Sequence, residues 1–233
     1  EVVELEDFVE AEIGQIAIEN VRPEWLLVAR GFKRKGALGK ATNYLFNAFL
    51  AVALLSIVWP IMLVTAFLIW LDDGKRDNAS VFYKQIRVGE DGQLFEIVKF
   101  RSMGKFAEKD GAAWAVKDDQ RVTKIGKYLR KYRIDELPQL KNVLKGDMGF
   151  VGPRPERPEF VDELAQDIPY FNYRHIVKPG LTGWAQVNGR DELSIPEKVK
   201  LDVTYLQRQS LWFDIHILWL TFVKVLLRDR VSH

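Results

Sequence analysis

The sequence predicts an α+β fold that is attached to a membrane, and three observations lead to this prediction. Residues 43–71 form an apolar run without a charge, residues 80–101 contain two strand-like stretches, and the remainder alternates amphipathic helical segments with glycine-rich loops. The 233 residues contain no βαβ series, no G-x-G-x-x-G loop and no Walker loop. The pattern therefore indicates mixed helices and strands around loops.

Charge and cysteine content exclude several classes of function. Lys and Arg number 34 against 32 Asp and Glu, a balance that does not indicate a nucleic-acid partner. Residues 1–24 hold eight acidic residues and one base, whereas residues 30–40 hold five bases and no acid. The absence of cysteine excludes disulfides, thiolate metal sites and cysteine nucleophiles, and the three scattered histidines do not suggest a metal site. The acidic N-terminus and the late apolar run do not resemble a signal peptide.

The apolar run is long enough to enter a bilayer. Its 29 residues would extend about 43 Å as one helix, against a hydrocarbon core of roughly 30 Å. Pro60 interrupts the run and removes the amide that would bond to the carbonyl of Ser56. The second arm, residues 60–71, is too short to cross alone at about 18 Å. Two topologies remain open, which are a single kinked span and a re-entrant helix-break-helix that returns to the same side.

The charge around the run bears on this choice. The basic flank before the run places that end in the cytoplasm by the positive-inside rule. A true span would then place residues 72–233 outside. If those residues act on a cytosolic substrate, the run has to turn back.

Two strands joined by the turn "GEDGQ" are expected at residues 80–101. Because side chains alternate along a strand, Lys99 and Arg101 share one face, which is either a solvated face or an anion site. Residues 120–133 predict a basic amphipathic helix, and "DELPQLKNVL" predicts a second helix with Pro138 in its first turn. The C-terminal residues 211–229 suit an interfacial or packing helix better than a span.

The adjacent carboxylates of Asp135 and Glu136 allow two interpretations. Asp135 either caps the N-terminus of the second helix or serves as a nucleophile. A glycosidase pair is a poor fit, because neighbours on a helix do not face each other across a sugar. Adjacency suits a division of labour in which one carboxylate attacks a diphosphate and the other holds Mg²⁺.

Guanidinium groups would have to neutralise the charge of such a reaction. Arg130 lies five residues before Asp135, and Arg154 lies in the stiff segment Pro153–Arg154–Pro155. Both are candidate phosphate clamps, although each alone is more often a surface arginine.

Three ordered segments resemble the bacterial sugar transferase family, the monotopic polyprenyl-phosphate phosphoglycosyl transferases. They read "VFYKQIRVGEDGQLFEIVKFRSM", "RVTKIGKYLRKYRIDELPQLKNVLKGDMGFVGPRPE" and "KPGLTGWAQVNGR". The resemblance runs from about residue 40 to 230. It implies transfer of a sugar 1-phosphate from a nucleotide diphosphate sugar, expected to be a UDP-sugar, to undecaprenyl phosphate through a covalent phosphoglycosyl-aspartate. This step would begin lipid-linked glycan synthesis, as in exopolysaccharide or lipopolysaccharide pathways.

The resemblance also assigns roles to residues. The family's nucleophile falls on Asp135, its Mg²⁺-associated glutamate on Glu136 and its phosphate-binding arginine on Arg130. Its nucleotide-site segment falls on Pro153, Arg154 and Pro155, and its basic residues before the nucleophile suggest Lys99 and Arg101 as further substrate contacts.

The family's membrane helix is re-entrant and broken at a proline, which matches Pro60. The full expectation is therefore an α+β fold with a re-entrant membrane helix-break-helix, amphipathic interfacial helices and a small β-hairpin around a cytosolic active site. This places the enzyme on the cytoplasmic face of the bacterial inner membrane, with membrane lipid as a partner and a homodimer left open. The expected divisions are an acidic linker segment at 1–38, the membrane helix at 39–72 and the catalytic domain at 73–233.

Three departures from the family pattern keep other interpretations open. A Lys-Arg-x-x-Asp signature usually opens the membrane helix, whereas its positions here are Asn43, Tyr44 and Asn47. Trp59 replaces a serine before the proline, and Ser56 can supply a nearby hydroxyl. Tyr132 and Arg133 replace two small polar residues before the carboxylates.

The alternatives are a non-catalytic membrane scaffold of a glycan-assembly complex and an ordinary glycosyltransferase that releases UDP. Residues 1–38 resemble the linker of longer exopolysaccharide-type members, which suggests that the chain is part of a longer protein.

Overall fold

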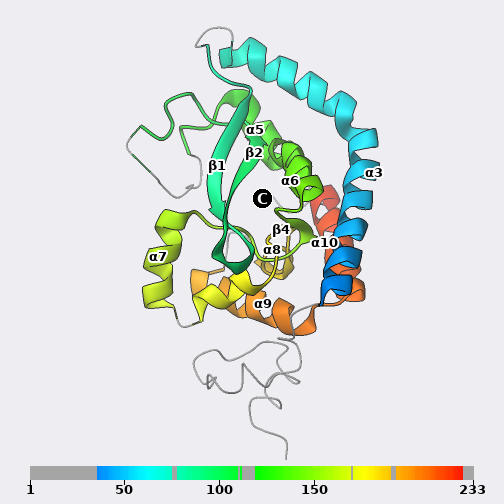
Figure 1. The fold of residues 1–233 in the computed structure, drawn as a ribbon. Helices are drawn as coiled ribbons and strands as arrows, with labels where there is room; N and C mark the ends of the chain where they lie inside the picture. Colours follow the sequence, from blue (N-terminus) through cyan, green and yellow to red (C-terminus); the bar gives the residue numbers. More distant parts are fainter. Residues whose placement is uncertain are drawn as a thin grey trace, which may run out of the picture. The chain divides into compact units, whose positions relative to one another are not determined.

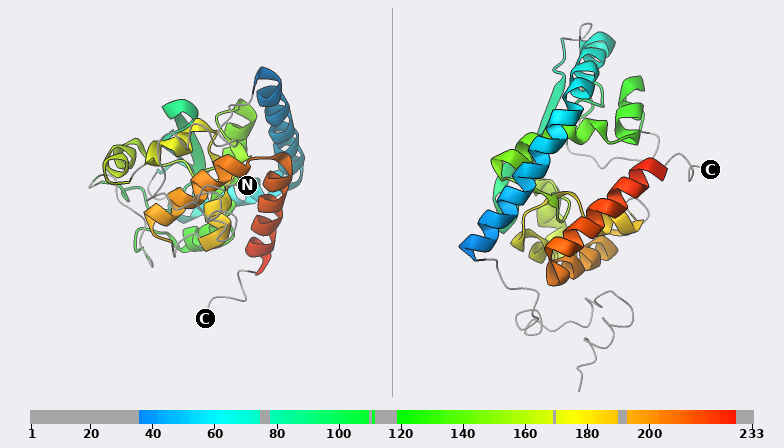
Figure 2. Two further views of the ribbon diagram at one scale, coloured as in Figure 1. Left: turned by 90° about the horizontal axis from the view of Figure 1, so that it is seen from below. Right: turned by 90° about the vertical axis from the view of Figure 1, so that its right-hand side faces the viewer.

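The computed structural model describes residues 36–74, 78–109, 111, 119–168, 170–189 and 193–227. These residues form helices and two two-stranded sheets, which confirms the predicted α+β class (Figures 1 and 2). They divide into two compact units, which we describe separately. Unit 1 comprises the described residues of Glu1–Tyr44, Arg87–Phe95 and Asp147–His233, and unit 2 comprises those of Leu45–Ile86 and Glu96–Gly146. Most of the expected acidic segment lies outside the described residues, and the divisions at 38 and 72 stay predictions.

The elements follow the expected order with two adjustments. They are α3 (Ala37–Ile69), η3 (Trp70–Gly74), β1 (Phe82–Val88), η4 (Glu90–Gly92), β2 (Leu94–Phe100), α5 (Lys124–Lys131), η5 (Ile134–Gln139), α6 (Leu140–Lys145), β3 (Gly149–Val151), α7 (Pro158–Asp167), η6 (Phe171–Ile176), β4 (Gly180–Thr182), α8 (Trp184–Gly189), α9 (Ile195–Arg208) and α10 (Leu211–Leu227). The predicted hairpin is confirmed. The helix expected at 120–133 is shorter, because Thr123 caps it, and the second helix begins as the 3₁₀ helix η5.

Helix α3 contains the apolar run, and it continues through Pro60. Figure 1 shows its axis bending between the blue and cyan parts, which is the effect expected of a proline inside a helix. One turn earlier, the Ser56 hydroxyl donates to the Ala53 carbonyl at 2.7 Å. With η3, the segment Ala37–Asp72 is long and apolar enough to cross a membrane by length and composition.

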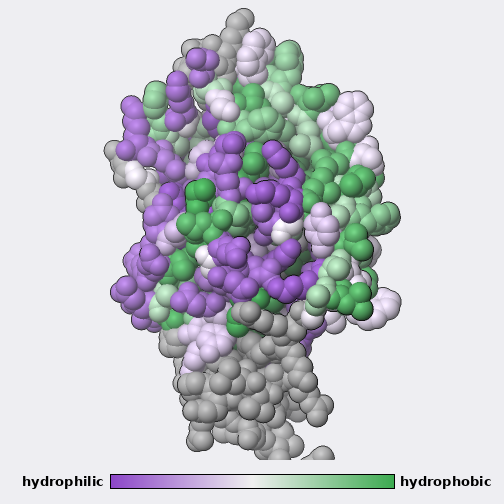
Figure 3. Space-filling model, viewed as in Figure 1, coloured by the Kyte–Doolittle hydropathy of each residue, from purple (hydrophilic) through white to green (hydrophobic). Residues whose placement is uncertain are grey.

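Much of the apolar surface of α3 is exposed, as the green side of Figure 3 shows. The exposed large side chains from its second half include Ile57, Trp59, Ile61, Leu63, Val64, Phe67 and Leu68. A soluble protein rarely exposes so large a contiguous apolar surface. Membrane association of this segment follows.

The core of unit 2 joins the end of α3 to the hairpin and α5 through Ile69, Phe100 and Leu129. Helix α5 approaches the chain beyond β2 closely, since a side chain at Gly126 would collide with the backbone of Ser102. The sequence therefore needs glycine here for the helix to pack.

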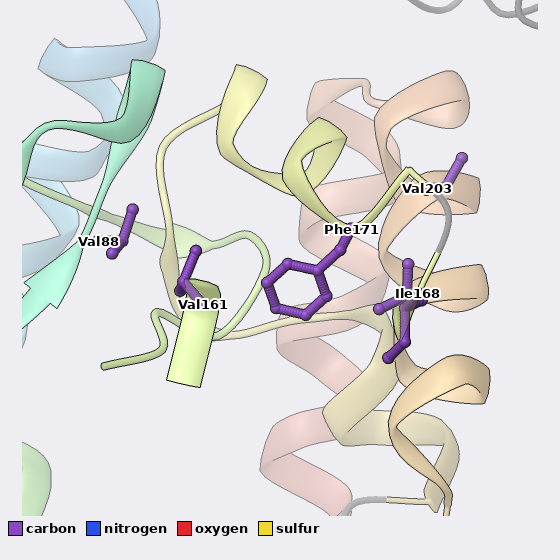
Figure 4. Packing of buried hydrophobic residues seen from close by; sticks show 6 residues of the cluster. Val88, Val161, Ile168, Phe171 and Val203 are labelled. Atoms are coloured by element: carbon purple, nitrogen blue, oxygen red, sulfur yellow. The ribbon is translucent and has the colours of Figure 1, made fainter. Parts of the chain in front are cut away.

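The core of unit 1 is formed by residues from β1, α7, η6 and α9. Figure 4 shows Val88, Val161, Ile168, Phe171 and Val203 packed together. A second element of this unit is the parallel pair β3–β4, in register Gly149↔Gly180 and Val151↔Thr182. Side chains at Gly152 or Gly180 would collide with the other segment's backbone, so the two glycines permit the close approach of the end of β3 to the start of β4.

Candidate active site

Asp135 and Glu136 lie inside the short helix η5 of unit 2. The residue that caps this helix is Arg133, which has left-handed backbone angles (φ 60°) and makes no side-chain capping bond. The interpretation of Asp135 as a helix cap is therefore wrong. A buried carboxylate inside the first turn needs another explanation.

The environment of Asp135 disfavours its charge. The residue is 8% exposed, and its carboxylate makes no hydrogen bond or salt bridge with any other residue in the described part of the chain. Burial raises the pKa of Asp135, and the neighbouring Glu136 raises it further, while Lys99, Arg133 and Arg130 act in the opposite direction. Asp135 is thus a desolvated carboxylate with three cations in its field, which is a favourable setting for a nucleophile toward an anionic substrate.

Two cations hold the neighbouring Glu136. Lys99 Nζ lies 3.2 Å from its Oε1, and Arg133 Nη2 lies 2.6 Å from its Oε2. Both oxygens are thereby oriented. The structure brings Lys99 and Glu136 together, whereas substrate contact by Lys99 stays a prediction. Arg133 entered the sequence analysis only as a departure from the family pattern. The signal for its role is its spacing of three residues from Glu136.

Lys99 is positioned by a contact between β2 and α6. The Asn142 side chain donates to the Glu96 carbonyl at 2.7 Å and accepts from the Val98 amide at 3.3 Å. The buried side-chain amide thus bonds to both a carbonyl and an amide of the β2 backbone, as a neighbouring strand would. It fixes β2 beside α6, the helix that follows Asp135. Sequence reasoning missed Asn142, because the helix around it also contains Lys141 and Lys145, so one more polar residue gave no signal of burial.

The two remaining predicted cations of unit 2 differ in their surroundings. Arg130 Nε donates to the Ser102 hydroxyl at 3.1 Å, and its charge acts on Asp135. The buried Arg101 guanidinium donates to the carbonyl of Ser80. The structure thus connects Arg130 with the carboxylates, whereas substrate contact by Arg101 stays a prediction.

The segment Pro153–Arg154–Pro155 belongs to unit 1, where it follows β3. The Gly180 amide donates to the Pro153 carbonyl at 3.0 Å, which continues the pairing of β3 with β4. Arg174 Nη2 donates to the Arg154 carbonyl at 3.0 Å. Arg154 is therefore carried on a backbone that is held from both sides.

Asp135 and Glu136 also fit the requirements of Mg²⁺. The described residues contain no cluster of three or more acidic or histidine side chains that could hold a metal by itself. Mg²⁺ usually takes one or two carboxylates together with substrate phosphates. Glu136 is a buried carboxylate beside Asp135, which is the type of group that Mg²⁺ takes as a ligand.

Comparisons with known proteins identify the family of the chain. Residues 38–228 match the family model described as bacterial sugar transferase. The chain is 45% identical over 179 residues, or 76% of its length, to the UDP-N-acetylgalactosamine-undecaprenyl-phosphate N-acetylgalactosaminephosphotransferase of Aeromonas hydrophila. It is 42% identical over 192 residues, or 81% of its length, to the uncharacterized sugar transferase EpsL of Bacillus subtilis. It is 40% identical over 180 residues, or 75% of its length, to the UDP-glucose:undecaprenyl-phosphate glucose-1-phosphate transferase of Escherichia coli.

These relatives differ in length. The matched region covers 41% of the Aeromonas protein and 38% of the Escherichia protein, but 89% of the Bacillus protein. The family match covers the hairpin, both carboxylates and the Pro-Arg-Pro segment. The chain belongs to the bacterial sugar transferase family.

Proposed function

We propose that the protein transfers a sugar 1-phosphate from a UDP-sugar to undecaprenyl phosphate through a phosphoglycosyl-aspartate on Asp135. The observation that carries this proposal is the buried Asp135 carboxylate, which has no partner among the described residues although its neighbour Glu136 is held by two cations. The relatives from Aeromonas and Escherichia, whose names specify this type of transfer, support the substrate classes.

In the first step, an oxygen of Asp135 attacks the phosphorus that bears the sugar. The bond from this phosphorus to the oxygen of the nucleoside monophosphate breaks, and the monophosphate leaves with the electron pair. Lys99, Arg133 and Arg130 favour the ionised form of Asp135, because their charges act against the rise in its pKa. Mg²⁺, when held by Glu136, would neutralise charge on the diphosphate.

In the second step, a phosphate oxygen of the polyprenyl phosphate attacks the same phosphorus. The acyl-phosphate bond breaks, Asp135 returns as a carboxylate, and a polyprenyl diphosphate sugar is released. In the first step, Arg130 and Arg154 would neutralise charge on the diphosphate of the donor, since a guanidinium offers several donors in a planar arrangement.

The acceptor lies in a membrane, and helix α10 of unit 1 supports attachment there in addition to α3. Its inward side carries polar groups, because Asp214 accepts from the Tyr205 hydroxyl at 2.8 Å and Thr221 bonds to Thr182 at 2.8 Å. Its outward side carries exposed apolar residues, including Trp212 and Trp219, which are 80% and 61% exposed. A helix with aromatic residues outside is suited to the headgroup region of one leaflet.

The nucleotide product tests the reaction. Protein in lipid nanodiscs, Mg²⁺ and undecaprenyl phosphate are incubated with a panel of UDP-sugars, and UMP is separated from UDP. We expect UMP with one donor and, without acceptor, one equivalent of UMP per protein with a sugar-phosphate adduct on Asp135. UDP as the product would instead identify an ordinary glycosyltransferase, and the absence of turnover with every donor would favour the scaffold.

Labelling tests the re-entrant topology and the cytoplasmic site. The chain has no native cysteine, so single cysteines at Leu38 and Lys75 report directly on the two ends of the membrane segment. In intact cells and inverted vesicles, we expect both to react only from the cytoplasmic side. Reaction from opposite sides would establish a single span.

A further inference from the structure

In the Pro-Arg-Pro segment of unit 1 and the glutamate that follows it, four successive backbone carbonyls each accept a hydrogen bond from another part of the unit. The Gly180 amide donates to Pro153 at 3.0 Å, and Arg174 Nη2 donates to Arg154 at 3.0 Å. Arg87 Nη1 donates to Pro155 at 3.1 Å, and the Val88 amide donates to Glu156 at 3.0 Å. Two of the four donors are therefore arginine side chains, in places where an ordinary strand would provide amides.

Proline explains why side chains are used here. Pro153 and Pro155 have no amide hydrogen, so the segment cannot form a regular ladder with a neighbouring strand. A long guanidinium can reach a carbonyl that a backbone amide cannot approach. The two arginines thus supply donors to the carbonyls of Arg154 and Pro155, between the two carbonyls that backbone amides reach.

Arg174 is built for two simultaneous contacts. It is 5% exposed, stacks at 5.1 Å over the Phe171 ring, and forms an ion pair of 2.7 Å with Asp202 Oδ2 through the same Nη2 that donates to the Arg154 carbonyl. Asp202 is 1% exposed and lies on α9. This pair connects the backbone of Arg154 to the core of unit 1.

Glu156 joins the two arginines. Its Oε2 lies 3.6 Å from Arg87 Nη1, and its Oε1 lies 3.9 Å from Arg174 Nη1. Ion pairs therefore join four residues into one cluster, in which Arg174 and Asp202 are buried. We call this cluster, which consists of Arg87, Arg174, Glu156 and Asp202, the carbonyl clamp. Buried ion pairs of this kind contribute little net stability compared with apolar residues of the same size. Their geometric effect on the segment is the better explanation for their presence.

We propose that Arg174 and Arg87 are positioning residues, which fix the backbone of Arg154 so that this residue binds the diphosphate of the donor. This inference rests on the proposed function. Neither arginine is expected to touch the donor itself. Their effect should therefore appear in the donor half-reaction and disappear when Arg154 is absent.

Ping-pong kinetics separate this role from a loss of folded protein. In such a mechanism kcat/KM for each substrate reports only its own half-reaction. Arg174→Lys keeps the positive charge, but its shorter side chain should not bring the ammonium to both Asp202 and the Arg154 carbonyl, which Arg174 reaches through Nη2. We expect kcat/KM for the UDP-sugar to fall about 10-fold or more and kcat/KM for polyprenyl phosphate to change less than about 2-fold. An equal loss for both substrates, or a loss for the acceptor alone, would overturn the inference.

Two further variants complete the test. Ser194→Ala removes the capping box at the N-terminus of α9, so it should lower the unfolding temperature without changing the ratio of the two kcat/KM values. In an Arg154→Ala background, Arg174→Lys should have no further effect on the donor half-reaction. A full additional 10-fold loss there would contradict action through Arg154.

Direct binding of UDP distinguishes this inference from the proposed function. If the wild-type protein forms no UMP but binds UDP, weaker binding by Arg174→Lys would still support the clamp. If the wild-type protein forms UMP and Arg174→Lys leaves both donor kcat/KM and UDP binding unchanged, the inference is wrong and the proposed function stands.

Discussion

The carboxylate pair of unit 2 and the carbonyl clamp of unit 1 use arginine and lysine in opposite ways. In unit 2, Lys99 and Arg133 bind the side chain of Glu136 and leave the buried Asp135 without a direct partner. In unit 1, Arg174 and Arg87 bind backbone carbonyls, and carboxylates pair with them in turn. The first arrangement keeps a reactive oxygen available, and the second holds a loop in place. The same residue types therefore serve chemistry in one cluster and geometry in the other.

The largest effect should come from removing the reactive oxygen. Asp135→Asn preserves shape but cannot form the covalent intermediate, so we expect turnover to fall by roughly 10³-fold or more. Because the pKa of Asp135 is raised by burial, its ionised form destabilises the fold as pH rises through that pKa. The unfolding temperature of Asp135→Asn at pH 7.5 should thus be unchanged or higher.

A matched control removes an exposed carboxylate. Glu159→Gln alters the charge equally on the surface of α7 and should retain turnover. Turnover by Asp135→Asn near that of Glu159→Gln would contradict the assignment of the nucleophile.

The pH dependence of stability should reveal the clamp of unit 1. Burial raises the pKa of Asp202 to about 6, against the attraction of Arg174, with Glu156 raising it and Lys198 lowering it. Burial, with the charge of Arg174, lowers the pKa of the adjacent His175 to about 4. Stability linked to Asp202 is present at low pH and is lost as pH rises through about 6. Stability linked to His175 is present above its ordinary pKa and is lost as pH falls toward 4.

These opposite slopes should nearly cancel in the wild-type protein, since each shift corresponds to about 3 kcal/mol. Asp202→Asn should leave a protein that loses stability on acidification from pH 6.5 to 4, and His175→Gln one that loses stability as pH rises over this range. Thermal unfolding at several pH values measures both slopes. Slopes of the same sign in the two variants would contradict the prediction that Asp202 and His175 have opposite effects on stability.

A smaller effect is expected from each cation on Glu136. Lys99→Met or Arg133→Ser removes one charged contact, which typically stabilises by about 1.5–3 kcal/mol, so donor kcat/KM should fall about 10-fold or more. In the double variant, the loss of transition-state free energy calculated from donor kcat/KM should exceed the sum of the two single losses, because Glu136 then keeps neither cation. The acidic limb of the pH–rate profile should also move to higher pH, since both cations lower the pKa of Asp135.

Lys84→Met is the control for these variants, because Lys84 pairs with Glu96 at the exposed surface of the hairpin. It should leave donor kcat/KM within about 2-fold. Unchanged kinetics in Lys99→Met would show that Glu136 needs no cation from β2.

Local patterns were sufficient to predict much of the fold. The alternation and turn residues of 80–101 indicated the hairpin, and the uncharged run indicated the long apolar helix, because burial and backbone geometry impose their periods on neighbouring residues. The helix at 120–133 was predicted too long, although Thr123 is a recognisable cap. Its other end is set by the left-handed backbone of Arg133, an uncommon conformation that side-chain type did not indicate.

The adjacency of Asp135 and Glu136, the cations before them and the stiffness of the Pro-Arg-Pro segment were determined by the sequence alone. Only the tertiary structure decided which cation binds which acceptor. Lys99 reaches Glu136 across 37 residues, and Asn142 reaches Glu96 across 46. Arg174 meets Asp202 and the Arg154 carbonyl only after η6, α9 and the loop beyond β3 have packed. Such contacts depend on the path of the chain between their partners, and the periodicity of neighbouring residues does not predict that path.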